Sequence, residues 1–130
     1  MPNIDDADTE ARRKDWTRRP LSLLLWWGLP IALGISSDLM DLPLRPAAAV
    51  WTVALAWMGA GCVLNALRCH RVHCYLSGPA LVLGAALAAL IATGAVDFGP
   101  QGLNIVIWGT FAATLLSFAP ELLWKRYARD

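Results

Sequence analysis

The chain holds all three of its cysteines and both of its histidines in one stretch of thirteen residues. These five donors are Cys62, Cys69, His70, His73 and Cys74. Thiolate and imidazole are the ligands preferred by soft and borderline metal ions, such as Cu(I), Zn(II) and, by the same softness, Hg(II). The thiolate is the form that binds, and Arg68 and Arg71 flank Cys69 with positive charge that favours it. The stretch therefore predicts a soft-metal site.

The spacing of the donors limits what kind of site this is. It matches no standard zinc spacing. Cys69 is followed directly by His70, and His73 is followed directly by Cys74. Both members of a neighbouring pair cannot easily face one ion, so the spacing favours two or three donors or a transient transfer over a closed four-ligand zinc. For Cys62 alone we expect ordinary packing, since free cysteine is among the most buried residue types.

Two other polar residues lie near the predicted helix ends. Asn65 lies about one turn beyond Cys62, and Glu121 follows Pro120 in the last turns of the final apolar run. A carboxylate at that depth is costly unless it is paired or reaches the interface. We expect Glu121 to form a salt bridge with Arg68 or Arg71; the alternative is that it offers an oxygen to a passing cation.

The elements that must position these side chains are membrane-spanning helices. The uncharged runs are 20–37, 46–67, 72–96 and 98–120. Each is close to or above the roughly 18 residues that mark a transmembrane candidate. They predict an all-α, polytopic membrane protein with four transmembrane helices in two hairpins, at about 20–37, 47–67, 77–96 and 103–124. Residues 1–19 are expected to form a cytoplasmic polar tail, in which Glu10 and Lys14 suit a short surface helix, and residues 20–130 the four-helix domain.

The positive charges are strongly asymmetric. Ten of the eleven Lys and Arg fall on one side of the predicted helices, and only Arg45 falls on the other. Basic residues concentrate on the cytoplasmic side of membrane proteins. This predicts a multi-pass protein of the cell (inner) membrane with both termini in the cytoplasm. The first helix lacks an obvious small-residue cleavage site before Asp38, so we expect it to stay in the mature chain.

The sequence also suggests how the donors are arranged. If the second helix continues past Leu67 to about Tyr75, then Cys62, Cys69 and His73 fall on one stripe of it. The segment 77–79, Ser-Gly-Pro, is expected to break that helix. The donors are then predicted to lie at or just below the inner membrane face.

Two short strings resemble those of a known group of proteins. One runs from Asn65 to Pro79 and contains Cys69, the triplet 73–75 (His-Cys-Tyr) and Gly78; the other is Pro120-Glu121 with 125–127, Lys-Arg-Tyr. Together they resemble small, largely uncharacterised prokaryotic membrane proteins loosely associated with mercury-resistance genes. The resemblance covers about a quarter of the chain and implies no assigned mechanism. Mer-type mercury transporters usually carry a cysteine pair in the first transmembrane helix, and this chain has none there.

Three functions remain open at this point. The first is binding or transport of a soft metal ion, mercuric, copper-type or zinc, through the cytoplasm-facing Cys/His cluster. The second is a structural or assembly subunit of a larger membrane complex. The third is a thiol redox sensor, in which Cys69 and Cys74 bridge only if the helix between them is broken. No Ser/His/Asp arrangement, carboxylate pair or phosphate loop predicts an enzyme. We expect the lipid bilayer as partner, a homodimer or larger complex, and no nucleic acid.

Overall fold

The computed structural model describes residues 3–123, and within that range the chain is helical and has no strand. Its elements are α1 (Ile4–Lys14), a 3-10 turn (Trp16–Arg18), α2 (Pro20–Leu23), a π-helical turn (Leu24–Gly28), α3 (Leu29–Leu39), α4 (Leu44–Cys69), α5 (Val72–Thr93), α6 (Gly102–Leu116) and α7 (Ala119–Leu123). Residues 124–130 lie outside the described range, and with them the basic residues that follow the last helix, Lys125, Arg126 and Arg129.

Four of these helical segments are long and apolar enough to cross a membrane. They are Pro20–Leu39, Leu44–Cys69, Val72–Thr93 and Gly102–Leu123, of 20, 26, 22 and 22 residues. At 1.5 Å per residue each spans the roughly 30 Å hydrocarbon core. The predicted number and class of helices are therefore confirmed. The first span contains a π turn just before Pro30, and that is where a residue without an N–H interrupts the regular ladder.

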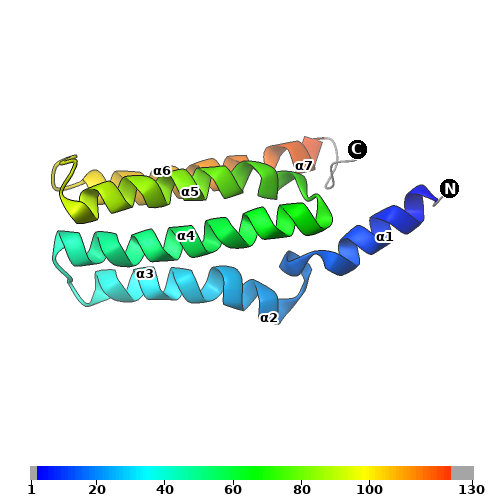
Figure 1. Ribbon diagram of the computed structural model, residues 1–130, viewed down its shortest axis with the longest axis horizontal. Coiled ribbons are helices and arrows are strands. Elements are labelled where there is room, and N and C mark those ends of the chain that lie inside the picture. Colours follow the sequence, from blue (N-terminus) through cyan, green and yellow to red (C-terminus); the bar gives the residue numbers. More distant parts are fainter. Residues whose placement is uncertain (1–2, 124–130) are drawn as a thin grey trace.

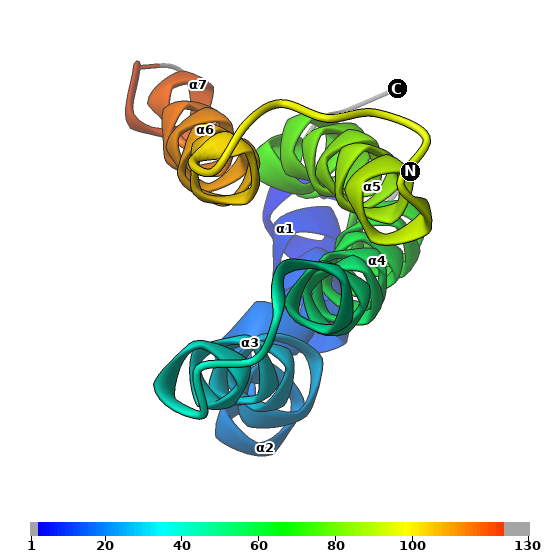
Figure 2. The ribbon, with the colours of Figure 1, turned by 90° about the vertical axis from the view of Figure 1, so that its left-hand side faces the viewer.

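The four spans form an open arc and not the closed bundle that their number suggests. Figure 2 shows the helices nearly end-on, with α3 and α6 at the two ends of the arc and α4 and α5 between them. Contacts run mainly between neighbours in the chain, α3 with α4, α4 with α5 and α5 with α6. The concave side of the arc is therefore lined by all four spans.

Small residues set the helix spacing along the arc. A Cβ at Gly34 would lie 2.6 Å from the indole ring of Trp51, so α3 lies directly on α4 there. A Cβ at Gly59 would lie 2.9 Å from Val82, and one at Gly78 would lie 2.9 Å from Val63. These contacts bring the backbones of α4 and α5 close together, as small residues do between membrane helices.

The turn between α4 and α5 differs from the sequence prediction. The second long helix ends at Cys69, and the third begins at Val72. His70 between them has φ of 55°, in the left-handed region that ends helices. The prediction that the second helix continues to Tyr75 is wrong, and so is the predicted stripe. The Ser-Gly-Pro segment 77–79 lies inside α5, because Pro79 is accommodated within the helix.

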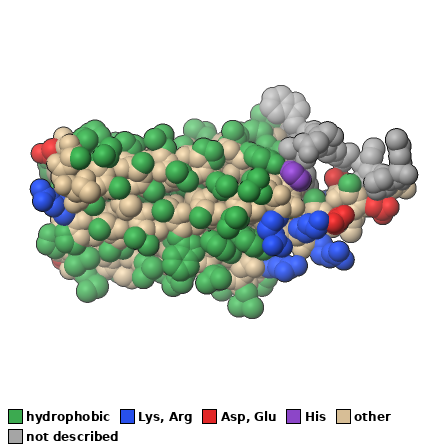
Figure 3. All heavy atoms as spheres, in the orientation of Figure 1, with side chains coloured by type: hydrophobic (Ala, Val, Ile, Leu, Met, Phe, Trp, Pro, Cys, Tyr) green, Lys and Arg blue, Asp and Glu red, His purple; other side chains and the backbone are tan. Residues whose placement is uncertain are grey.

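One end of the molecule gathers the positive charge. Figure 3 shows Lys and Arg side chains clustered around the end where α1 and α2 lie, with apolar side chains along the length of the helices. Figure 1 shows that the turn between α4 and α5, the helix α1 and the helix α7 all lie at this end. We call it the basic end, and the other, which carries Arg45, the far end. Among residues 3–123, seven of the eight Lys and Arg precede the first span or lie at the turn between α4 and α5.

Candidate functional site

A buried polar network lies at the basic end, with Arg71 at its centre. The Arg71 guanidinium donates through Nη1 to Oδ2 of Asp15 at 2.6 Å, and to the hydroxyl of Thr17. It donates through Nε to Oε1 of Glu121 at 3.2 Å. Arg71 directly follows the left-handed residue at the turn, and so its side chain reaches back over the ends of α4 and α5. One cation thus joins the N-terminal segment, the turn and α7.

Asp15 is completely buried and fully hydrogen-bonded. Its Oδ1 accepts from the backbone N–H of Thr17 at 2.9 Å and from Nδ2 of Asn65 at 3.0 Å. Burial alone would raise the pKa of Asp15, but these hydrogen bonds and the guanidinium of Arg71 hold it below its ordinary value. For Arg71, burial opposes the charge, yet its bonds to Glu121 and Asp15 raise its pKa. Both groups stay ionised at neutral pH.

Glu121 orients His73. Its Oε1 accepts from the backbone N–H of His73 at 3.1 Å and lies 2.6 Å from Nδ1 of the same residue. An ionised carboxylate only accepts, so this contact requires a proton on Nδ1 of His73 and leaves Nε2 facing Cys74. Nε2 lies 3.4 Å from Sγ of Cys74. The predicted salt bridge of Glu121 is confirmed, with Arg71 as the partner.

Two of the three thiols meet beneath this network. Cys62 on α4 and Cys74 on α5 are both free and buried in the same core cluster, and their side chains interact. Each sulfur also lies close to an N–H donor: Trp27 Nε1 is 3.3 Å from Sγ of Cys62, and Asn65 Nδ2 is 3.4 Å from Sγ of Cys74. Cys62, for which the sequence favoured packing alone, is thus part of the cluster.

The other two predicted donors point elsewhere. Cys69 is buried and donates its S–H to the backbone oxygen of Asn65 at 3.1 Å. His70 is exposed, and its Nδ1 lies 2.7 Å from the hydroxyl of Tyr75. The five donors therefore separate into a buried set, Cys62, His73 and Cys74, and two residues with other partners. Within residues 3–123, no three His, Cys, Asp or Glu side chains are already arranged to hold a metal ion. This arrangement offers a pair of thiols with an imidazole beside it.

The thiol pair borders a groove on the concave side of the arc. A cavity of about 410 Å³ reaches from α3 across α4 and α5 to α6. Its polar lining is at the basic end and comprises Thr17, Cys62, Arg71, His73 and Ser77, and the rest is mainly apolar and aromatic. A second, polar recess lies next to it, and the two share Thr17, Arg71 and Phe118. Cys62 thus lines a cavity that adjoins the polar recess at the basic end.

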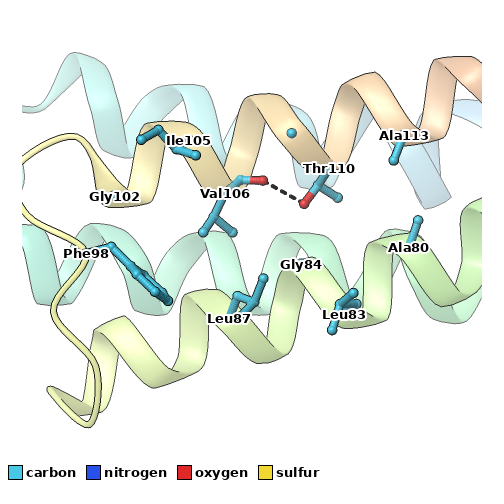
Figure 4. Close-up of a pocket in the computed structure, with 11 residues that line it drawn as sticks. Ala80, Leu83, Gly84, Leu87, Phe98, Gly102, Ile105, Val106, Thr110 and Ala113 are labelled. Carbon is cyan, nitrogen blue, oxygen red and sulfur yellow. Dashed lines mark hydrogen bonds between the residues drawn. The ribbon is translucent and has the colours of Figure 1, made fainter.

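A different pocket, between α5 and α6, has no such chemistry. Figure 4 shows its lining, with Leu83 and Leu87 on either side of Gly84 on α5, Thr110 on the facing helix α6, and Phe98 toward the end at Gly102. The only polar side chain labelled there, Thr110, donates back to the oxygen of Val106 at 2.7 Å. None of its lining residues is titratable. It is a packing feature of the membrane-spanning part.

Asp15, Thr17 and Trp27 were not predicted as part of the site. Asp15 lies in a polar tail rich in both charges, where nothing in the local sequence separates it from its exposed acidic neighbours. Its partners Asn65 and Arg71 are 50 and 56 residues away. Only the folded arrangement brings these groups together. The tail therefore contributes to the core of the site through a residue without a local signal.

The comparison with known proteins leaves the geometry as the basis for function: no family model, curated protein or solved structure matches the chain.

Proposed function

We propose that this chain is a multi-pass protein of the inner membrane that binds a soft metal ion between Cys62 and Cys74. Both termini and the basic end face the cytoplasm, because basic residues concentrate there. The observation that carries the proposal is the placement of two buried, free cysteines from neighbouring helices in one cluster, with His73 beside Cys74. The ion would be Cu(I) or Hg(II), since these accept two thiolates, whereas zinc sites take four ligands.

The surroundings of the thiols support binding. His73 Nε2 faces Cys74, and its other ring nitrogen is held by Glu121. A carboxylate behind a histidine fixes the orientation of the ring, as is usual at metal centres. His73 can therefore supply a third ligand. All three Cys and both His of the chain lie between positions 62 and 74, so we propose binding and hand-off at the cytoplasmic side and not a relay of ligands across the membrane.

A reversible disulfide is the competing use of the same pair. A Cβ at Gly78 would lie 3.6 Å from the Cβ of Cys62, which places Cys62 opposite position 78, one helical turn along α5 from Cys74. The thiols thus meet diagonally. A disulfide needs Cβ atoms about 3.5–4.5 Å apart, whereas a bridging ion lies between the sulfurs and tolerates a longer separation. The diagonal geometry favours the ion.

Titration of the purified, reduced protein in detergent with Cu(I) and Hg(II) tests this proposal. We expect one ion per chain, with affinity lowered at least about 100-fold in Cys62→Ser or Cys74→Ser. Cys69→Ser is the matched control, since Cys69 is equally buried but bonded to a backbone oxygen. Equal binding by all three variants would contradict the proposal. Loss of binding in Cys69→Ser alone would show that the ion binds at the turn between α4 and α5 and not between Cys62 and Cys74.

A further inference from the structure

We propose that the groove on the concave side of the arc binds one anionic phospholipid, with its phosphate at Arg18 and one acyl chain between α3 and α6. The groove is bordered by Cys62 and His73, but the proposed lipid contacts are with other residues and do not depend on metal binding. Three observations carry it: the shape of the groove, the charge at its mouth and an unused hydrogen-bond donor at an intermediate depth.

The shape suits one chain of a lipid. The cavity of about 410 Å³ lies within the range of roughly 300–1,000 Å³ for small-molecule sites. Trp27 and Ile31 line it from the first span, and Phe111 lines it from α6. Figure 2 shows that α3 and α6 stand apart at the ends of the arc. In a membrane such a lateral opening is filled by an apolar chain.

The charge at the mouth selects the headgroup. The polar recess beside the groove is lined by Thr17, Arg18 and Arg71, with Glu121 on its wall. Arg71 is fully used by Asp15 and Glu121. Arg18 is exposed and forms no ion pair with any residue between 3 and 123. Its guanidinium is therefore available to a phosphodiester, which it can bind through two hydrogen bonds.

The depth of Ser77 matches the ester region of a lipid whose phosphate is at Arg18. Ser77 is completely buried beside the groove, and its hydroxyl has no hydrogen-bond partner of good geometry among the described residues, although it lies near the thiol of Cys62. By contrast, Thr52, Thr110 and Thr114 each bond a carbonyl of their own helix. Ser77 is five residues into α5, about 7.5 Å from its start. An ester carbonyl at that depth would accept its O–H after a small rotation of the Ser77 side chain toward the groove.

Native mass spectrometry of the detergent-purified protein tests the site. The probes are phosphatidylglycerol and phosphatidylcholine with identical acyl chains. We expect one phosphatidylglycerol to be retained per chain, several-fold more than phosphatidylcholine. Arg18→Gln should lower its retention to the phosphatidylcholine level, and Ser77→Ala should lower retention of both lipids. Arg12→Gln is the control, since Arg12 is also exposed and basic but does not line the groove or the recess.

Three results would overturn the inference. Equal retention of the two lipids would remove the selectivity assigned to Arg18. An equal effect of Arg12→Gln and Arg18→Gln would show a general surface attraction. A dimer that carries no lipid would show that a second copy of the chain covers the groove. None of these results measures ion binding by Cys62 and Cys74, so failure of the lipid site is distinguishable from failure of the metal site.

Discussion

Charged side chains are buried at the basic end of the molecule and exposed at the far end. At the basic end Asp15 is completely buried and shares Arg71 with Glu121. At the far end Asp38 is exposed and accepts the indole N–H of Trp51, at 3.2 Å. Arg45 at that end is exposed as well. A protein that only needed to span a membrane could keep its charges at the surface at both ends. The burial of charge at one end marks that end as specialised.

The largest expected effect comes from removing the cation that the basic end encloses. Arg71→Leu leaves Asp15 and Glu121 without their shared partner. Removing one member of a buried ion pair costs about 3–5 kcal/mol. The side chain of Arg71 is 15% exposed, so we expect the lower part of that range. Thermal unfolding in detergent measures the change.

Arg45→Leu is the matched control at the far end. Exposed substitutions usually change stability by less than about 0.5 kcal/mol. A similar loss of stability in both variants would contradict the contrast between the two ends.

The next effect tests the apolar region between the ends, which depends on close packing. A Cβ at Gly84 would lie 2.8 Å from Cγ2 and 3.0 Å from Cβ of Thr110. Gly84→Ala therefore separates α5 from α6, and overpacking of this kind costs about 1–3 kcal/mol. Gly109→Ala is the control, because nothing lies within 4 Å of its Cβ. We expect it to stabilise α6 slightly, since alanine favours helix. If both variants shifted the unfolding temperature in the same direction, the contact between Gly84 and Thr110 would not set the spacing of α5 and α6.

A smaller effect is expected on acidification. The pKa of Asp15 lies below its ordinary value of 3.8, so its ionised form adds stability that is fully present above that pH. The contribution is lost as the pH falls through the lower, folded-state pKa. The unfolding temperature of the wild type should therefore fall more steeply below about pH 4 than that of Asp15→Asn. Parallel curves for the two proteins would mean that the Asp15 charge does not stabilise the fold.

The smallest effect is expected on α1, where the charges are at the surface. Glu10 and Lys14 form an exposed i,i+4 ion pair with a separation of 2.5 Å. Exposed pairs of this kind contribute little and are screened by salt. We expect Glu10→Gln to leave the unfolding temperature unchanged in moderate salt. A clear fall in the unfolding temperature would show that charges outside the buried network also stabilise the fold.

The sequence was sufficient for the helices and insufficient for the site. Hydropathy identifies four spans because the bilayer imposes one length and one composition on all of them. The turn at His70 was not predicted, because a left-handed histidine leaves no pattern as clear as a glycine would. Once that turn is placed, the predicted stripe of Cys62, Cys69 and His73 is replaced by a contact between Cys62 and Cys74 across two helices.

The other differences between the predicted site and the structure involve partners that are far apart in the sequence. The salt bridge of Glu121 was predicted, because a carboxylate inside an apolar run needs a cation and few were near. Asp15 was not predicted, since a carboxylate in a polar tail needs no partner. The thiol pair depends on how α4 and α5 face each other, and helix–helix register is set by contacts such as the one at Gly78.

X-ray absorption spectroscopy of the protein loaded with one Cu(I) tests the central claim most directly. The account predicts two sulfur ligands in the wild type and in Cys69→Ser, and one sulfur ligand or no bound ion in Cys62→Ser and in Cys74→Ser. Retention of both sulfur ligands in Cys62→Ser, or loss of one in Cys69→Ser, would contradict it.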